Sequence, residues 1–209
     1  MSNKKFEILT RETLFQGYFR VDRFKLRHER FEGGWSDAFT REVFDRGGRA
    51  AAVLPYDPKT DKLVLIEQFR SGVMAAGEYP WITEVVAGII DGNEAPEDTA
   101  RREAMEEAGC QISELQKIAN YFSSPGCLTE TITLFAGRTT APENGQLHGV
   151  SHEQEDIRVI VLDAAQAISL LYGNKIRDAL TLIALQWFAM HHTELRSRWL
   201  VSDVGTPII

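Results

Sequence analysis

A stripe of small residues near the middle of the chain limits the fold more than any other feature. Ala100, Ala104 and Ala108 recur at every fourth position, which places them on one side of a helix. Such a narrow stripe allows a helix to lie close against a sheet. Pro96 is tolerated in a first helical turn, and Gly109 is typical of the position that follows a helix. The pattern predicts a helix over Pro96–Ala108, packed tightly on a sheet.

Segments with strand character surround this helix. The runs with a period of two or with continuous apolar character are Tyr18–Phe31, Asp37–Phe44, Ala50–Leu54, Lys62–Phe69, Trp81–Ile90, Ile118–Ser123, Thr129–Ala136 and Ile157–Leu162. Two further helices are predicted at Ala164–Leu171 and Lys175–His192, a turn at Tyr56-Asp57-Pro58, and a surface loop over Arg138–Val150. Strands interleaved with a few helices favour an α/β or α+β fold.

The strand pattern changes at Gly47-Gly48. Residues 1–48 read as strands throughout, and a second series of apolar runs begins after the two glycines. A chain of 209 residues is long enough for one substantial domain with a smaller one attached. We therefore expect a small β domain over 1–48 and a larger domain over 49–209.

The negative charge of the chain is concentrated in one segment. The formal net charge is −7, yet Glu84–Glu107 alone holds eight carboxylates against two arginines. The first 50 residues carry 11 Lys+Arg and 8 Asp+Glu. An acidic chain is a poor general binder of nucleic acid or of an anionic membrane. The uneven distribution indicates an acidic site at the centre of the chain.

Cysteine use and hydropathy point to a cytoplasmic protein. The chain has 2 cysteines, too few for a disulfide framework, and their number is typical of a reducing compartment. The N-terminus shows no apolar segment followed by a cleavage site. The longest apolar stretch, Ala179–Met190, is too short to span a bilayer.

Three glutamates of the predicted helix lie within one turn of each other. Glu103, Glu106 and Glu107 project to one side, while the alanines occupy another. Like charges at this spacing repel unless a cation sits among them. Taken alone, the pattern favours a solvated helix face. As a site, an oxygen-only ligand set suits Mg²⁺ or Mn²⁺ rather than zinc.

The spacing around these glutamates resembles a known signature. Gly88 is followed by five residues, Glu94, seven residues, and then Arg102-Glu103-Ala104-Met105-Glu106-Glu107-Ala108-Gly109. This series is similar to the signature of the Nudix hydrolases, although Ala104 and Cys110 stand where that family prefers bulky aliphatic residues. The resemblance implies a Nudix-type α/β/α sandwich with a mixed sheet, and hydrolysis of a nucleoside diphosphate linked to another group.

The resemblance also implies roles for the motif residues. Glu103 and Glu107 would bind divalent cations, joined by the backbone carbonyl of Ala87, with Glu106 close behind as a catalytic residue. The motif residues with a structural role would be Gly88, Glu94, Arg102 and Gly109. Two or three Mg²⁺ ions, for which Mn²⁺ could substitute, would neutralise the diphosphate and activate the water that attacks phosphorus.

Two features outside the motif resemble the bacterial ADP-ribose pyrophosphatases within this family. Pro125 lies sixteen residues after Gly109, although Pro-Gly alone would indicate a plain turn. The stretch His148–Val159 resembles a mobile acidic loop of those enzymes. The resemblance implies Glu153 as general base and Glu155 as an additional metal ligand, and the order of the two stays open. Without it, both would read as part of a solvated loop.

The front segment resembles the β domain through which those enzymes pair as homodimers. The similarity runs over roughly Glu12 to His192. Arg41 and Arg70 match positions that contact substrate phosphates, and Tyr18 matches an aromatic that stacks on adenine from the partner subunit. An arginine suits a diphosphate because its planar fork forms paired, charge-assisted hydrogen bonds. Taken alone, these residues would read as a strand-face charge, a strand-end cap and interface filler.

The sequence thus predicts a Mg²⁺-dependent ADP-ribose pyrophosphatase that releases AMP and ribose 5-phosphate. Its partners would be a small nucleotide-sugar substrate and a second copy of the chain, with no nucleic acid and no membrane. One alternative is a pyrophosphatase for another nucleoside-diphosphate sugar, such as GDP-mannose. A second is a Nudix-fold module that binds a nucleotide without hydrolysing it.

Overall fold

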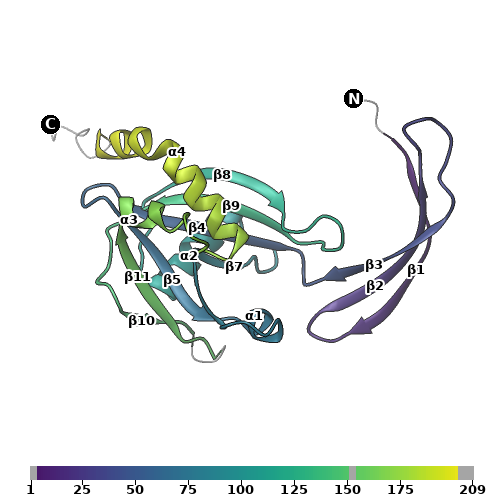
Figure 1. Cartoon of the computed structure of the whole chain (residues 1–209), viewed down its shortest axis with the longest axis horizontal. Helices are drawn as coiled ribbons and strands as arrows, with labels where there is room; N and C mark the ends of the chain where they lie inside the picture. The colour runs from purple at the N-terminus through teal and green to yellow at the C-terminus, as the bar shows by residue number, and fades with distance from the viewer. Residues whose placement is uncertain (1–3, 151–153, 202–209) are drawn as a thin grey trace. The chain divides into compact units, whose positions relative to one another are not determined.

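The computed structural model describes residues 4–150 and 154–201 (Figure 1). The chain forms two compact units. The first unit contains Met1–Arg49 and Tyr121–Ile132, and the second contains Ala50–Asn120 and Thr133–Ile209. The chain thus passes from the first unit to the second near residue 49, and residues 121–132 belong again to the first unit.

The first unit is built on an antiparallel sheet. Its strands are β1 (Phe6–Gln16), β2 (Arg20–His28) and β3 (Phe39–Asp45), paired in the order β1-β2-β3. Segment 121–132 joins this unit through a parallel bridge between Phe44 and Leu128. Almost every residue of β1 is exposed.

The second unit is built on a larger sheet with helices on both faces. Its elements are β4 (Arg49–Asp57), β5 (Lys62–Phe69), α1 (Ser71–Ala75), β6 (Trp81–Glu84), β7 (Val86–Ile89), α2 (Pro96–Ala108), β8 (Glu114–Phe122), β9 (Thr131–Arg138), β10 (Leu147–His148), β11 (Ile157–Asp163), α3 (Ala164–Ser169) and α4 (Ala179–Val201). Three of these strands, β4, β8 and β9, extend by one or two residues into the first unit. Within the described residues the sheet has eight strands, in the order β10-β11-β5-β4-β9-β8, with β6 beside β5 and β7 beside β4.

The sheet of the second unit is mixed. Strand β5 pairs antiparallel with β11, β4 and β6. Strands β4 and β9 run in the same direction, because Thr131 donates its amide to the Gly48 carbonyl and Thr139 donates to that of Tyr56. The mixed sheet beside a small N-terminal β unit agrees with the expected fold class.

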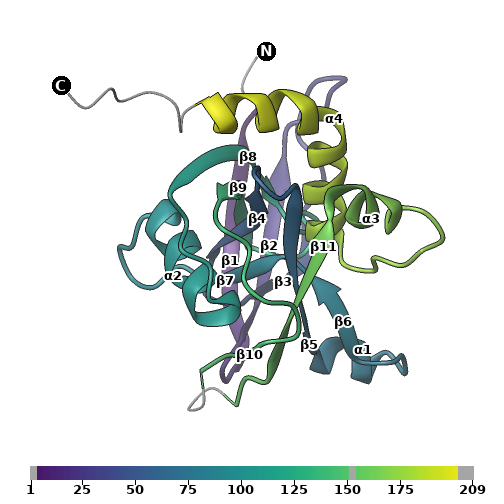
Figure 2. The same cartoon turned by 90° about the vertical axis from the view of Figure 1, so that its left-hand side faces the viewer.

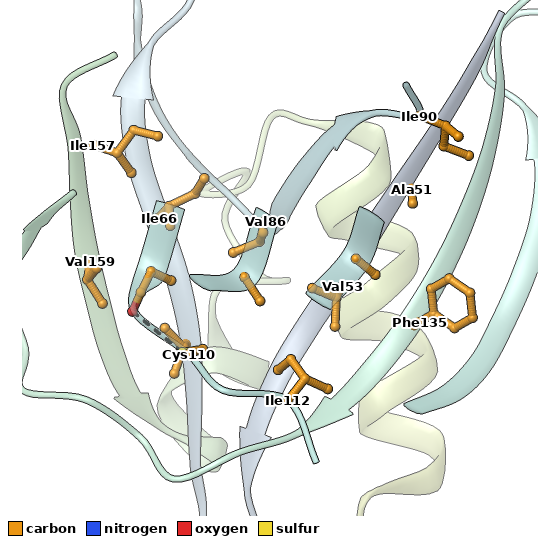
Figure 3. Close-up of a cluster of buried hydrophobic side chains, with 14 residues drawn as sticks. Ala51, Val53, Ile66, Val86, Ile90, Cys110, Ile112, Phe135, Ile157 and Val159 are labelled. Atoms are coloured by element: carbon orange, nitrogen blue, oxygen red, sulfur yellow. Dashed lines mark hydrogen bonds between the residues drawn. The ribbon is translucent and has the colours of Figure 1, made fainter. Parts of the chain in front are cut away.

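Helix α2 covers one face of this sheet, as the alanine stripe predicted. Ala100, Ala104 and Ala108 are fully buried, and they pack in one cluster with sheet residues such as Val53 and Ile66. Figure 3 shows the sheet side of this cluster, where Val53, Ile66, Val86 and Val159 come from four different strands. The helix ends at Ala108, and the C-cap Gly109 has φ +62°. The small side chains therefore bring the backbone of α2 close to β7.

Helix α4 covers the opposite face (Figure 2). The ring of the buried Tyr56, on β4, lies 4.9 Å from that of Phe188 and 6.1 Å from that of Trp199. The hydroxyl of Tyr56 donates to Asp61, which also accepts from His192 at 2.7 Å and Arg196 at 3.0 Å. Asp61 thus joins the turn after β4 to the middle of α4, which completes the expected α/β/α sandwich.

The expected single strand Trp81–Ile90 is wrong. It divides at Val85 into β6, which pairs with β5, and β7, which pairs with β4. The amide of Val85 donates instead to the hydroxyl of Thr181 at 2.9 Å. The segment therefore passes from one neighbouring strand to the other, a change that its continuous apolar pattern does not signal.

Other predicted boundaries also moved. The last helix starts at Ala179, where Asp178 caps Thr181, and it continues past His192 because Leu195 and Trp199 are buried. The expected turn at Tyr56-Asp57-Pro58 begins later, since β4 extends to Asp57. The short strand β10 lies within the expected loop Arg138–Val150, and no element was predicted where α1 forms. Among the described residues, no helix is both long enough and apolar enough to cross a bilayer.

Candidate active site

Gly88 and Glu103 bring helix α2 into direct contact with strand β7. A Cβ atom placed on Gly88 would overlap the carboxylate of Glu103, with Oε1 as the nearest atom. A side chain at position 88 would therefore displace this carboxylate. The backbone of Gly88 does not have a positive φ, so its conformation does not require glycine. The close approach of Glu103 explains why glycine stands at this position.

Glu107 is the most deeply buried carboxylate of the helix. Its side chain is 3% exposed, and its Oε2 accepts a hydrogen bond from the amide of Ala87 at 3.1 Å. Burial raises the pKa of Glu107 to about 8, the Ala87 amide opposes the rise, and the charges of Glu103 and Glu155 add to it. Glu107 is thus a buried acid in a negative environment, rather than part of a solvated helix face.

Arg102 connects the other motif glutamates. Its guanidinium lies 3.2 Å from Glu94, 2.7 Å from Glu103 and 2.9 Å from Glu106. The hydroxyl of Thr99 donates to Glu94 at 2.8 Å. Arg102 and Glu94 therefore tie the loop before the helix to the helix itself, and Arg102 supplies positive charge between glutamates that would otherwise repel.

Glu155, in the loop before β11, interacts with the glutamates of α2. Its Oε2 accepts from the amide of Val150 at 3.1 Å. Burial raises the pKa of Glu103, Arg102 opposes this, and the charges of Glu106 and Glu155 raise it further. The fold therefore brings the predicted ligand Glu155 within electrostatic range of both Glu103 and Glu107.

Arg70 directly follows β5 and precedes α1. Its Nε donates to Glu84 at 2.7 Å. Glu84 is 8% exposed; burial raises its pKa, and Arg70 opposes that rise. The charge of Arg70 also lowers the pKa of Glu107, which places the arginine within reach of the site. Sequence reasoning assigned no role to Glu84, although a lone acid in the apolar run Trp81–Ile90 was a usable signal.

The structure does not assign four of the predicted residues to this group. Tyr18, Arg41 and Pro125 belong to the first unit. Tyr18 is 82% exposed, and the guanidinium of Arg41 lies 4.7 Å from the ring centre of Phe39. Glu153 lies outside the described residues.

The carboxylates interact electrostatically, but each is bound to a protein donor. Across residues 4–150 and 154–201, no three His, Cys, Asp or Glu side chains form a ready-made metal site. Glu103 is bound by Arg102, Glu107 by the Ala87 amide and Glu155 by the Val150 amide. Oxygen donors with a buried, poorly compensated negative charge nevertheless fit a hard divalent cation. Glu103, Glu107 and Glu155 are the side chains that could hold it.

Known proteins resemble this chain over most of its length. The chain is 42% identical over 193 residues to an ADP-ribose pyrophosphatase of Escherichia coli (strain K12), which covers 92% of each protein. It is 34% identical over 188 residues to a GDP-mannose pyrophosphatase of Yersinia pestis (strain Pestoides F), covering 90% of this chain and 93% of the other.

A solved structure described as an ADP compounds hydrolase has a similar fold. Its TM-score is 0.66 at 18% identity, covering 91% of this chain and 98% of the other. The model of the NUDIX domain matches residues 46–181, a range that contains the motif and the carboxylates described above. The family resemblance seen in the sequence is confirmed: the chain belongs to the NUDIX family.

Proposed function

We propose that the chain hydrolyses ADP-ribose to AMP and ribose 5-phosphate with the help of Mg²⁺. The observation that carries the proposal is that Glu103 and Glu155 both lie within electrostatic range of the buried Glu107. A module that only bound a nucleotide would have no need for such a concentration of carboxylates. The choice of ADP-ribose is supported by the 42% identity to the E. coli ADP-ribose pyrophosphatase.

In this proposal the carboxylates hold the cations and Arg70 holds the substrate. Glu103 and Glu107 would hold the ions from the helix, together with Glu155 from the loop before β11 and the Ala87 carbonyl. Bound divalent ions supply positive charge beside the diphosphate oxygens and make a nearby water more acidic. Arg70 donates paired hydrogen bonds to a phosphate, and Glu84 keeps its guanidinium in place.

The reaction needs one water and one proton acceptor. Water adds to one phosphorus, the bond from that phosphorus to the bridging oxygen breaks, and the departing phosphate keeps the bond electrons. Glu153 accepts the proton that the water loses, with Glu155 as the other candidate and Glu106 assisting from the helix. Comparing Glu153→Gln with Glu155→Gln separates the roles, because the base variant loses kcat while retaining its affinity for metal.

The first unit, in this proposal, pairs two copies of the chain. Strand β1 exposes several large apolar side chains, among them Phe6 at 69%, Ile8 at 54% and Phe15 at 57%. Exposed apolar groups of this size on one strand are typical of an interaction surface. In the dimer the partner subunit's Tyr18 would stack on the adenine, and Arg41 would contact a phosphate.

One assay tests the reaction. Purified full-length protein with MgCl₂ is incubated with ADP-ribose or with GDP-mannose, and the nucleotides are resolved by ion-exchange chromatography. We expect AMP from ADP-ribose at a far higher kcat/KM than GMP from GDP-mannose.

The other outcomes identify the alternatives. Release of GMP without AMP would contradict the proposal and favour the activity named for the Yersinia relative. If neither nucleotide is released while calorimetry detects binding of ADP-ribose, the chain is a binding module. The Glu107→Gln variant serves as the background control for contaminating hydrolases.

A further inference from the structure

Gly149 lies where the loop before β11 contacts helix α2. Its amide donates a hydrogen bond to the carbonyl of Glu106 at 3.2 Å. The last carbonyls of a helix have no partner within the helix and must be satisfied from outside. The loop therefore satisfies a carbonyl in the same turn that presents Glu103 and Glu107.

A second contact holds the same two segments together. A Cβ on the C-cap Gly109 would lie 2.8 Å from Cε1 of His148, which immediately precedes Gly149. His148 also pairs with Ile157 of β11. The short strand β10 thus connects the end of α2 to the main sheet, and the loop begins from a fixed point.

The backbone of Gly149 is in a conformation that only glycine adopts readily. Its φ is +109°, and a Cβ at this position would lie 2.8 Å from Cβ of Glu155 and 3.0 Å from its carbonyl oxygen. These contacts are with backbone and near-backbone atoms, which cannot move away as the end of a flexible side chain could. Only glycine allows the two ends of the loop to approach this closely.

The close approach also fixes the carboxylate of Glu155. The amide of Val150, next to Gly149, donates to Glu155 Oε2 at 3.1 Å. The amide of Ala87 holds Oε2 of Glu107 at the same distance. The two carboxylates are thus held in the same way, each by one oxygen bound to a backbone amide. A hydrogen bond of this kind orients a metal ligand and tunes its affinity.

We propose that Gly149 is a positioning residue, which fixes the base of the loop on helix α2 so that the Glu155 carboxylate is directed toward the cation held by Glu103 and Glu107. The inference rests on the proposed function, because it takes Glu155 as a cation ligand. Gly149 acts through Glu155 and does not itself touch substrate or metal.

The test is a double-mutant cycle read by metal binding in the absence of substrate. Calorimetric titration with Mn²⁺ is performed on the full-length protein and on Gly149→Ala, Glu155→Gln and the double variant. We expect each single variant to weaken Mn²⁺ affinity about 10- to 100-fold. The double variant should bind no more weakly than Glu155→Gln, because the alanine then has no ligand left to misplace.

Gly145→Ala is the matched control. Gly145 lies in the turn just before β10 and also has a positive φ, +85°, but a Cβ there meets no atom within 4 Å. Alanine at 145 therefore introduces comparable backbone strain without the contact with Glu155, and its Mn²⁺ affinity should equal that of the unmodified protein. Thermal unfolding followed by circular dichroism establishes that each variant is folded.

A measurement on the unmodified protein covers the case in which Gly149→Ala does not fold. If Gly149 and Val150 help to place a ligand, metal binding must stabilise their hydrogen bonds in return. Hydrogen exchange of the Val150 amide should therefore slow at least severalfold on addition of Mg²⁺. Unchanged exchange would overturn the proposal.

Three other results would also overturn it: normal Mn²⁺ affinity in Gly149→Ala, equal losses in the two glycine variants, or losses that multiply in the double variant. Failure of the proposed function is recognised separately, because unmodified protein would then release no AMP from ADP-ribose. Normal Mn²⁺ affinity in Glu155→Gln would remove the ligand role of Glu155 and this inference with it.

Discussion

Gly88 faces Glu103 so closely that a single added carbon at position 88 would occupy the space of the glutamate carboxylate. Gly88→Ala should therefore displace Glu103 and weaken Mn²⁺ binding about 10- to 100-fold. Calorimetric titration and the thermal unfolding midpoint measure the two consequences, metal affinity and fold. Gly72→Ala is the control, because a Cβ at position 72 meets no atom within 4 Å. Equal behaviour of the two variants would show that Glu103 holds no metal.

Glu107→Gln should separate stability from activity. The amide oxygen can still accept from Ala87, so the local geometry survives. Burial raises the pKa of Glu107 to about 8, so the charge is costly to the folded protein once it ionises. Without divalent ions at pH 9, the variant should unfold at the same or a higher temperature than the unmodified protein. Its kcat should fall on the order of 100-fold or more.

The exposed Glu97 lies on the same helix, and Glu97→Gln is the control for both measurements. Activity that survives Glu107→Gln would show that the cation is held elsewhere.

Arg70→Lys should lower kcat/KM about 10- to 100-fold, which corresponds to about 1.4–2.7 kcal/mol of transition-state stabilisation. Lysine keeps the positive charge beside Glu84 but lacks the planar fork that binds a phosphate through two donors. Steady-state kinetics with ADP-ribose provide the measurement. Arg177→Lys is the matched control, since Arg177 pairs with Glu78 on the exposed surface at 3.0 Å. A normal kcat/KM in Arg70→Lys would exclude a bidentate phosphate contact.

Asp61→Asn should make the protein less stable at neutral pH and have little effect in acid. Burial alone would raise the pKa of Asp61, but Tyr56, His192 and Arg196 lower it below its ordinary value of 3.8. A carboxyl with a lowered folded-state pKa stabilises the protein above its unfolded pKa, and this contribution is lost as the pH falls. Asparagine tolerates the φ of +59° at this position, so the substitution isolates the charge.

Urea unfolding at pH 7 should show a loss of about 1–3 kcal/mol, shrinking toward zero below pH 4. Asp37→Asn, at a fully exposed aspartate, should show neither effect. A pH-independent loss at position 61 would mean that packing, and not charge, anchors α4.

Phe15→Asp should convert the proposed dimer into a monomer. A buried interface on β1 would have to desolvate the new carboxylate without a partner, which costs far more than exposing it. Light scattering coupled to size-exclusion chromatography gives the mass of each species. Leu147→Asp, an equally drastic change at an exposed residue of the second unit, is the control. A monomeric unmodified protein would contradict the dimer directly.

Local signals explain why helix α2 could be predicted to the residue. Its beginning is marked by Pro96, its end by Gly109, and its buried face by alanines four apart. Strand β5 was predicted equally well, because turn residues bound its apolar run. The carboxylates of α2 follow from the same local geometry, since residues four apart share one side of a helix.

Contacts between distant segments explain what was missed. The division at Val85 depends on Thr181, and the pairing of Arg70 with Glu84 depends on how β5 aligns with β6. The role of Gly149 appears only when Glu155 is folded back beside it. Such relationships need three-dimensional register, which no local pattern encodes. The roles assigned to the site residues remain predictions, for Glu103, Glu107 and Glu155 as for Tyr18, Arg41 and Glu153.

The division at Val85 has a consequence for how the two halves of the proposed site are supported. One continuous segment carries Glu84, which holds Arg70, and Ala87, which holds Glu107. Between them, Val85 is fastened to Thr181 at the start of α4. Under the proposed function, the arginine that would contact the diphosphate and a carboxylate that would hold the cation are therefore both supported by one segment, which is anchored at Thr181. A substitution at Thr181 would displace the supports of Arg70 and Glu107 at the same time. Substrate affinity and metal affinity should therefore change together.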